Sequence, residues 1–259
     1  MEQGIFAQAT PLEESIWSAI VAQASAVADS DGVVGSSLRR AVLDRSDFRD
    51  AVAFQIGSRL AAGTDDRERI ARIAQDALRE DEALASAAAL DLKAVLDRDP
   101  AAPGALSVLL RYKGYIALQA WRLSHRLWSM GRDDLAKFLH GCAADMLDIS
   151  IHPSAAIGSS VVLDHGSGII IGATVVVGDD VTILQHVTIG RAGTSARVAP
   201  RIGRGVLLSS GATILGDITI GDFAKIGAGS LVTQSVPAHC TAVGAPARLV
   251  NCAEADLVP

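Results

Sequence analysis

Aliphatic residues return every six positions through the second half of the chain. The period begins at Ile151, Ile157 and Leu163, slips by two residues, and is later interrupted once more by a longer stretch. Its later members are Ile171, Val177, Ile183, Ile189, Ile202, Leu208, Ile214, Ile220, Ile226 and Val232. A six-residue period fits neither an α-helix nor an alternating strand. It predicts a prism in which three hexapeptides form a coil of about 18 residues, with aliphatic side chains inside and small residues at the corners.

Hydrophobic residues in the first half of the chain are spaced as they are on amphipathic helices. Pro100, Pro103 and Gly104 interrupt this pattern, so residues 98–104 are expected to form a loop. The expected helices cover residues 11–28, 38–62, 65–79, 82–96, 106–130 and 133–147.

The hexapeptide pattern resembles the left-handed parallel β-helix of hexapeptide-repeat acyltransferases. Its thirteen positions keep phase across only two interruptions, and a right-handed β-helix or another solenoid is the alternative. We therefore expect an α+β protein with three parts. Residues 1–147 would form an α-helical capping and oligomerisation domain. Residues 148–250 would form the left-handed β-helix acyltransferase domain with a loop at 190–201, and residues 251–259 a short tail.

Composition narrows the range of partners. The chain of 259 residues carries 23 basic and 29 acidic side chains, a net charge of −6, so no basic stripe is available for nucleic acid. Cys142, Cys240 and Cys252 are widely spaced, which is typical of a reducing cytoplasm and indicates neither a disulfide framework nor a zinc site. We expect a cytoplasmic protein with no metal, no signal peptide and no membrane span.

Asp148 and His165 are candidates for acid–base chemistry. A histidine titrates near neutral pH and suits the removal of a proton from a hydroxyl group. The two residues are 17 positions apart, close to one coil, so they are expected to stack on adjacent coils of one prism face. The carboxylate would then orient the imidazole and stabilise its cation. His152 and His186 receive no role, and a structural one is favoured for both.

Several segments in fixed order resemble serine acetyltransferases, which acetylate L-serine with acetyl-CoA. They are Tyr112-Lys113-Gly114, His125-Arg126-Leu127-Trp128, Asp148-Ile149-Ser150-Ile151-His152-Pro153, Leu163-Asp164-His165 and Ile183-Leu184-Gln185-His186-Val187-Thr188. The resemblance implies an acyltransferase with acetyl-CoA as co-substrate, His165 as general base and Asp148 as its partner. It also implies that Asp99 and Asp164 hold the amino-acid substrate, although Asp99 is almost as well explained as a helix cap.

The donor is expected to lie in a groove along the prism. Ser210, Ala228 and Gly229 are small enough for a pantetheine arm to approach the backbone, and Lys225 and Arg248 are candidates for its phosphates. Small residues are also what a tight corner needs, so none of these positions is diagnostic alone.

The loop at 190–201 departs from the resemblance. Serine acetyltransferases carry an arginine and a histidine here that contact the amino-acid substrate, and the matching positions are Val198 and Ala199. Arg191 or Arg197 is expected to compensate. Otherwise the acceptor would be a different hydroxy amino acid or amino alcohol, and cysteine inhibition becomes doubtful. A non-catalytic hexapeptide-repeat scaffold is the third hypothesis.

The expected assembly is a homotrimer or a dimer of trimers, since a prism wall this poor in charge needs a partner. Relatives that bind O-acetylserine sulfhydrylase do so through a tail ending in isoleucine. This chain ends in Pro259, so a complex of that kind is not expected.

Overall fold

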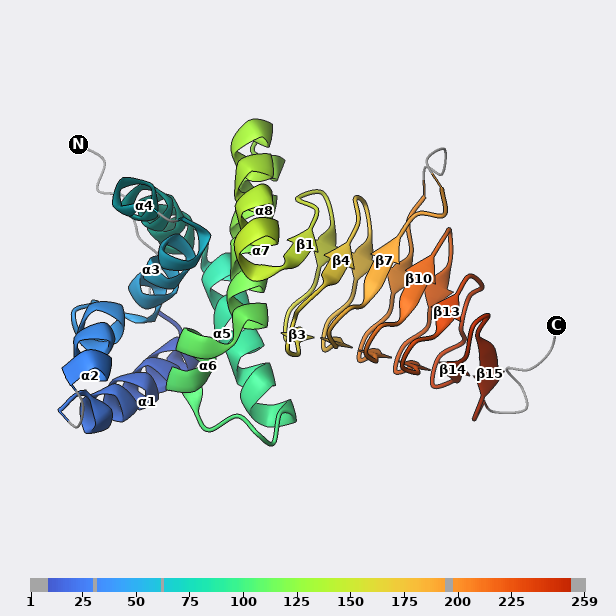
Figure 1. Ribbon diagram of the computed structural model, residues 1–259, viewed down its shortest axis with the longest axis horizontal. Helices are drawn as coiled ribbons and strands as arrows, with labels where there is room; N and C mark the ends of the chain where they lie inside the picture. Colours follow the sequence, from blue (N-terminus) through green and yellow to red (C-terminus); the bar gives the residue numbers. More distant parts are fainter. Residues whose placement is uncertain (1–8, 30–31, 62, 194–197, 253–259) are drawn as a thin grey trace. The chain divides into compact units, whose positions relative to one another are not determined.

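The computed structural model describes residues 9–29, 32–61, 63–193 and 198–252 (Figure 1). The chain has two compact units, residues 1–119 and residues 120–259. Helices make up the first unit, and a stack of short parallel strands makes up most of the second. The predicted fold class, helices followed by a parallel β-helix, is confirmed. No helix in the described ranges is long and apolar enough to cross a membrane.

Local sequence signals set the bounds of the helices in the first unit. Thr10 caps the first helix in a reciprocal capping box with Glu13. The helix expected over residues 38–62 is broken, because the Asp47 side chain accepts a hydrogen bond from the amide of Asp50 at 2.8 Å and starts a new helix. The helices are α1 (Pro11–Ala28), α2 (Gly32–Leu38), the π-helix η1 (Arg39–Leu43), α3 (Phe48–Leu60), α4 (Thr64–Glu80), α5 (Glu82–Arg98), α6 (Ala105–Arg111) and the beginning of α7 (Lys113–Ser129).

Three sheets form the faces of the prism in the second unit, and all their strands are parallel except β15 at the end of the third sheet (Figure 1). The first sheet contains, in order, β1 (Ile149–Ile151), β4 (Ile169–Ile171), β7 (Thr188–Gly190), β10 (Thr213–Leu215) and β13 (Leu231–Val232). The second contains β11 (Thr219–Ile220), β8 (Arg201–Ile202), β5 (Val176–Val177) and β2 (Ala156–Ile157). The third contains β15 (Arg248–Val250), β14 (Thr241–Val243), β12 (Lys225–Ile226), β9 (Leu207–Leu208), β6 (Thr182–Ile183) and β3 (Val162–Leu163).

The aliphatic repeat fills the inside of the prism, as its period predicts. Ile171, Ile189 and Ile214 stack along the first sheet and are almost fully buried. Ile170 points the other way and is half exposed. Each buried rung removes an aliphatic side chain from water, and such burial contributes about 1.5–3 kcal/mol per residue.

Coil length varies along the prism. Paired residues are 20 positions apart between the first two coils, as at Ile149 and Ile169, but 18 apart between the next two, at Ile170 and Thr188. The two-residue slip in the repeat therefore lengthens the first coil. The pair Val176 and Arg201 is 25 positions apart, because additional residues stand in the chain between β7 and β8.

Helices cap the first coil within the second unit. The second half of α7 supplies polar side chains that meet backbone oxygens beyond β1, and α8 (Asp133–Leu147) immediately precedes that strand. Trp121 Nε1 donates to the carbonyl oxygen of His152 at 3.2 Å, and His125 Nδ1 lies 2.8 Å from that of Pro153. These contacts satisfy backbone acceptors at the open end of the β-helix.

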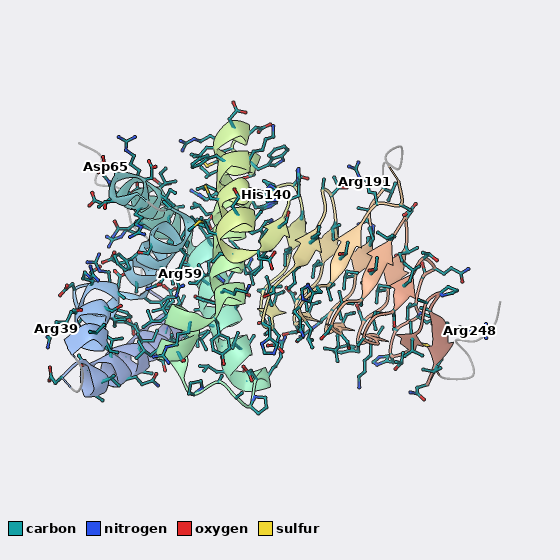
Figure 2. The ribbon with its side chains drawn as sticks, viewed as in Figure 1. Arg39, Arg59, Asp65, His140, Arg191 and Arg248 are labelled. Atoms are coloured by element: carbon teal, nitrogen blue, oxygen red, sulfur yellow. A yellow bond between two sulfur atoms is a disulfide. The ribbon has the colours of Figure 1, made fainter. Side chains whose placement is uncertain are left out.

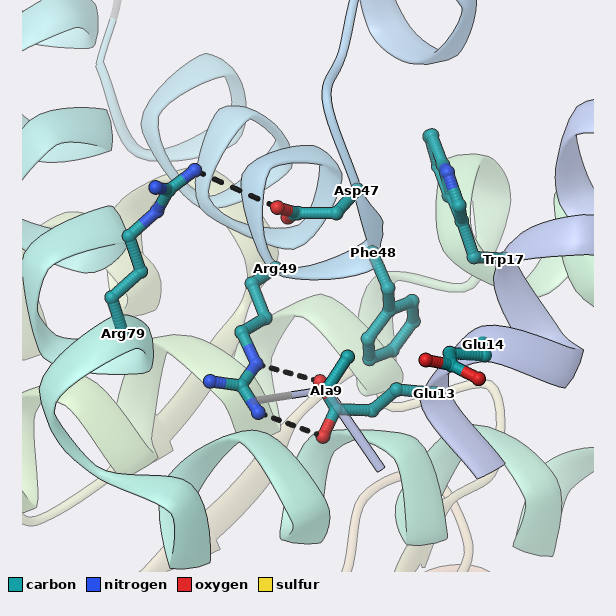
Figure 3. A pocket seen from close by; sticks show the side chains of 8 residues that line it. All are labelled: Ala9, Glu13, Glu14, Trp17, Asp47, Phe48, Arg49 and Arg79. Atoms are coloured by element: carbon teal, nitrogen blue, oxygen red, sulfur yellow. Dashed lines mark hydrogen bonds and ion pairs between the residues drawn. The ribbon is translucent and has the colours of Figure 1, made fainter. Parts of the chain in front are cut away.

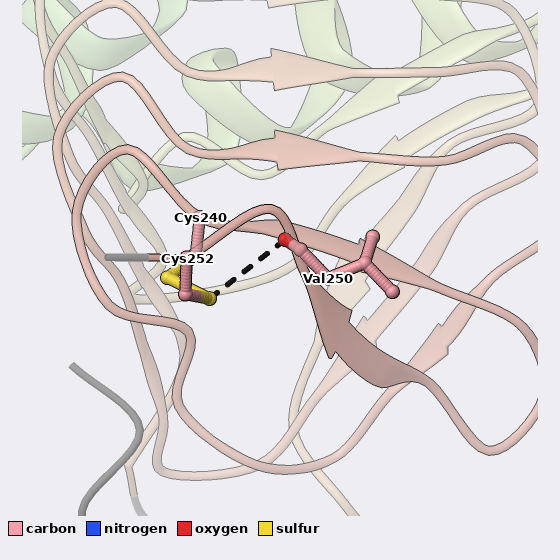
Figure 4. The surroundings of a disulfide bond; sticks show 3 residues. All are labelled: Cys240, Val250 and Cys252. Carbon is pink, nitrogen blue, oxygen red and sulfur yellow. Dashed lines mark hydrogen bonds between the residues drawn. A yellow bond between two sulfur atoms is a disulfide. The ribbon is translucent and has the colours of Figure 1, made fainter. Parts of the chain in front are cut away.

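The last strand turns back and closes the other end of the prism (Figure 4). β15 runs antiparallel to β14, with Thr241 opposite Val250, and this brings Cys252 beside Cys240. The two form a disulfide across 12 positions of sequence. The expectation that the cysteines stay unpaired is therefore wrong for this pair, because wide spacing along the chain did not reveal the reversal of direction. The cysteines therefore no longer support the expectation that the protein works in a reducing compartment.

The disulfide predicts a definite thiol count. Denatured but unreduced protein should react with one equivalent of iodoacetamide, at Cys142, and reduced protein with three, because two of the three cysteines are paired. Mass spectrometry of the alkylated protein measures both numbers. Three labels without a reductant would contradict the pairing.

Candidate functional site

One corner of the prism carries most of the candidate residues. It joins the third sheet to the first. It consists of Asp148 and residues 164–168, 184–187, 209–212 and 227–230, with one such segment wherever the chain passes from one coil to the next. We call it the histidine corner, since His165 and His186 both lie on it. The end at Asp148 is called the lower end.

Equivalent positions of the histidine corner share a left-handed backbone. The five positions are Asp148 (φ 58°), Gly168 (φ 67°), His186 (φ 60°), Gly211 (φ 69°) and Gly229 (φ 65°). Backbone bonds hold them in register: the amide of His186 donates to Ser167 at 2.7 Å, and that of Gly229 to Ser210 at 2.9 Å. Glycine adopts this conformation without cost, whereas other residues do so at some expense.

His165 lies at the lower end of this corner with its imidazole open to solvent. Its side chain is 73% exposed, and its backbone is also left-handed, at φ 56°. Nε2 lies 3.9 Å from Oδ1 of Asp164, within range of a charge interaction but too far for a hydrogen bond. The imidazole is therefore accessible to a substrate.

Asp148 occupies the same corner. Its Oδ2 accepts a hydrogen bond from the amide of Gly168 at 3.1 Å, and its carbonyl oxygen accepts from the same amide at 2.8 Å. The residue stacked on Asp148 is thus Gly168, three positions beyond His165, since the first coil is longer than the 17 positions that separate the two candidates. The pairing of Asp148 with His165 stays a prediction.

The candidates for the donor side follow along the same corner. Ser210 lies one coil boundary above His186, and Ala228 and Gly229 one boundary higher. Exposed Lys225 lies on β12, just before the highest segment. Arg248 is also exposed, on β15 at the end of the stack (Figure 2). Residues far apart in sequence thus form one line parallel to the prism axis.

Of the described acceptor-side candidates, only Asp164 lies on this corner. Arg191 follows β7 at the corner between the first and second sheets, where its charge acts on His152 (Figure 2). Arg197 lies outside the described residues. Val198 is 43% exposed, whereas Ala199 is 4% exposed and returns the chain to the prism.

Asp99 belongs to the first unit, where it ends α5. Its carboxylate accepts hydrogen bonds from the amide of Ala101 at 2.8 Å and from the hydroxyl of Tyr112 at 2.9 Å. These bonds organise the loop after α5, as the capping interpretation expects. Its role toward a substrate stays a prediction.

A polar cluster between α8 and the first coil was not foreseen. His140 Nε2 lies 3.0 Å from Oγ of Ser150, and His152 Nδ1 lies 2.8 Å from Oγ of Ser154. Burial lowers the pKa of His140; burial, then the charges of His140, Lys137 and Arg191, lower the pKa of His152. The contact between His140 and Ser150 joins α8 to the first coil. The spacing of residues along the chain does not predict this contact.

A pocket in the helical unit is lined by charged and aromatic side chains (Figure 3). Its volume is about 490 Å³, including space open to solvent. Glu13 and Arg49 form a buried ion pair in it at 2.7 Å, and the hydrogen bond that Arg49 donates to the Glu13 carboxylate raises the pKa of Arg49. The charges are paired with each other, as in a structural ion pair. The described residues hold no cluster of three or more ligands for a metal ion.

Comparison with protein families gives two matches. Residues 16–120 match the family described as serine acetyltransferase, N-terminal. Residues 199–234 match the family described as bacterial transferase hexapeptide (six repeats).

Individual relatives cover nearly the whole chain. Serine acetyltransferase of Salmonella typhimurium is 41% identical over 239 residues, which are 92% of this chain and 88% of that protein. The structure of soybean serine acetyltransferase complexed with serine superposes with a TM-score of 0.90 and 42% identity, covering 93% of this chain and all of the other. A serine acetyltransferase in complex with CoA gives a TM-score of 0.87 and 36% identity, covering 92% of this chain and all of the other.

The lowered pKa values predict a dependence of stability on pH. Below about pH 6.5 the unfolded chain binds protons at His140 and His152 that the folded chain binds only at lower pH. Their contribution is therefore present above about pH 6.5 and is lost as the pH falls. The urea midpoint should be lower at pH 5 than at pH 7, and the double variant His140→Gln/His152→Gln should reduce the difference.

His239→Gln is the matched control, because this histidine is exposed at another corner. An unchanged pH difference in the double variant would contradict the prediction.

Proposed function

The chain belongs to the serine acetyltransferase family, and we infer from this that it transfers the acetyl group of acetyl-CoA to the hydroxyl of L-serine. It is an acyltransferase with acetyl-CoA as co-substrate. The observation that best supports the chemistry at residue level is the exposed imidazole of His165 on a corner that also bears carboxylates and a run of small residues.

The proposed general base is His165. Its imidazole removes the proton of the serine hydroxyl, because an unassisted hydroxyl is a poor nucleophile at neutral pH. The oxygen then attacks the thioester carbonyl, and the sulfur leaves with the electron pair of the broken bond. Asp148 and Asp164 supply negative charge at the same corner, which stabilises the imidazolium that forms. Asp164 is also the proposed contact for the substrate ammonium group. A substrate contact is proposed separately for Asp99 in the first unit.

The proposed path of acetyl-CoA follows the histidine corner. Ser210, Ala228 and Gly229 leave the backbone accessible to the amides of the pantetheine arm. Lys225 and Arg248 provide cations for the phosphates toward the far end of the stack. This direction places the thioester near the lower coils, where His165 lies.

The residues expected to bind the acceptor support a second candidate function. Val198 and Ala199 supply neither a cation for a carboxylate nor an imidazole. Arg191 and Arg197 are the proposed substitutes, acting on the acceptor from this loop. The second candidate is the same transfer to another hydroxy amino acid or to an amino alcohol.

The proposed assembly is a homotrimer or a dimer of trimers, with donor grooves between neighbouring prisms, and light scattering of the purified protein measures it. The proposed location is the cytoplasm, where acetyl-CoA is available. The tail lies outside the described residues beyond Cys252. We propose that it does not bind O-acetylserine sulfhydrylase; binding that disappears on deleting residues 253–259 would overturn this.

The first test removes the proposed base. His165→Ala should lower kcat by at least about 10²-fold, since general base catalysis is typically worth that much. Asp148→Asn should also lower kcat while keeping the fold, because the amide oxygen still accepts a hydrogen bond from Gly168. Release of CoA from acetyl-CoA with L-serine measures both. Full activity of His165→Ala, in protein with an unchanged circular dichroism spectrum, would favour a scaffold instead.

The second test compares acceptors. L-serine should give the highest kcat/KM in a panel that also contains L-homoserine, L-threonine and ethanolamine. Arg191→Ala should raise the KM for acceptors that carry a carboxylate and leave the KM for ethanolamine unchanged, because ethanolamine has no carboxylate. A preference for ethanolamine over every amino acid would replace L-serine with an amino alcohol.

A further inference from the structure

His186 interrupts a series of glycines. At the equivalent corner position the coils carry Asp148, Gly168, His186, Gly211 and Gly229, all left-handed. A bulky side chain at such a position costs free energy that glycine does not cost. Sparsely populated backbone conformations held by non-glycine residues cluster at functional sites. His186 is therefore a residue whose presence needs an explanation.

Gly168 makes room for the imidazole. A Cβ atom added at Gly168 would lie 2.2 Å from Nδ1 of His186, so no other residue fits there without moving the ring. Because Nδ1 faces Gly168, Nε2 is the nitrogen on the far side of the ring. His186 is exposed, so this nitrogen is available to a ligand.

The position of His186 along the corner indicates which ligand group it meets. His165 lies on the segment below it and Ser210 on the segment above it. Neighbouring coils are separated by about 4.8 Å. A pantetheine arm that descends past Gly229 and Ser210 toward an acceptor activated at His165 must place its thioester at the intermediate level. That level is occupied by His186.

We propose that Nε2–H of His186 donates a hydrogen bond to the thioester carbonyl oxygen of acetyl-CoA and stabilises the negative charge that develops there. The inference rests on the proposed function. It gives the two histidines different tasks: His165 takes the acceptor proton, and His186 polarises the group under attack. A donor aimed at a developing oxyanion is typically worth 10²- to 10³-fold in rate.

The acceptor oxygen forms a bond to the carbonyl carbon while its proton passes to His165, and the carbonyl oxygen gains the charge that His186 stabilises. When the intermediate collapses, the carbon–sulfur bond breaks and the sulfur leaves with the electron pair. The thiolate takes the proton held by the His165 imidazolium, so no oxidant, reductant or metal is required.

Two variants of His186 and one of His165 test the proposal. His186→Ala should lower kcat/KM for acetyl-CoA by about 10²- to 10³-fold. His186→Gln, whose amide nitrogen can replace Nε2 as a donor, should stay within about tenfold of the wild type. His165→Gln should lose activity as fully as His165→Ala, because an amide is no base.

His239→Ala is the matched control. His239 is also an exposed histidine with a left-handed backbone, at φ 62°, but it lies at another corner and stacks on Phe223 at 5.3 Å between ring centroids. Its removal should leave kcat/KM unchanged. Gly168→Ala gives an independent measurement, since its methyl group would displace the His186 ring. It should lose activity in the wild type and cause no further loss when His186 is already alanine.

Wild-type turnover is measured first. No turnover of L-serine or any other hydroxyl acceptor would overturn the proposed function and this inference together. Wild-type turnover with an unaffected His186→Ala would overturn the inference alone. If His186→Ala raised only the KM for the acceptor, His186 would bind the acceptor and not the thioester, which would also overturn the inference.

Discussion

The backbone hydrogen bonds between successive coils are the constraint on which the site depends. Each coil pairs with the next in parallel register, so a residue has the same corner or face as its equivalent one coil away. This is how Asp148, His186 and Gly229 come to lie along one line although more than a coil separates each from the next. The same bonds force the left-handed backbone on every residue at that position. The fold thus both aligns the chemical groups and sets the cost of placing them there.

Much of the fold could be predicted from the hexapeptide period, because an aliphatic side chain must point inward once per face. The reversal at β15 and the pairing of Cys240 with Cys252 could not be predicted, since an antiparallel return of three residues leaves no periodic signal. The break before α3 was also missed. There the capping side chain of Asp47 overrides a continuous hydrophobic pattern.

The candidate site was partly accessible to sequence reasoning. The motif around His165 and the small residues from Ser210 to Gly229 indicated the chemistry, and coil register places them on one corner. The expected stacking of Asp148 on His165 assumed equal coils, whereas the first coil is longer and puts Gly168 above Asp148. His186 received no role, because the role proposed for it depends on its backbone conformation and on the glycine beneath it. Neither can be seen in a list of residues.

The central claim is that an acetyl group passes from sulfur to oxygen at the histidine corner. A crystal structure of the protein with CoA and L-serine tests it most directly. The account predicts that the pantetheine arm follows the corner past Gly229 and Ser210, with the CoA sulfur beside His186 and the serine hydroxyl within hydrogen-bonding distance of His165. Binding of CoA on another face of the prism, or a serine hydroxyl out of reach of His165, would contradict it.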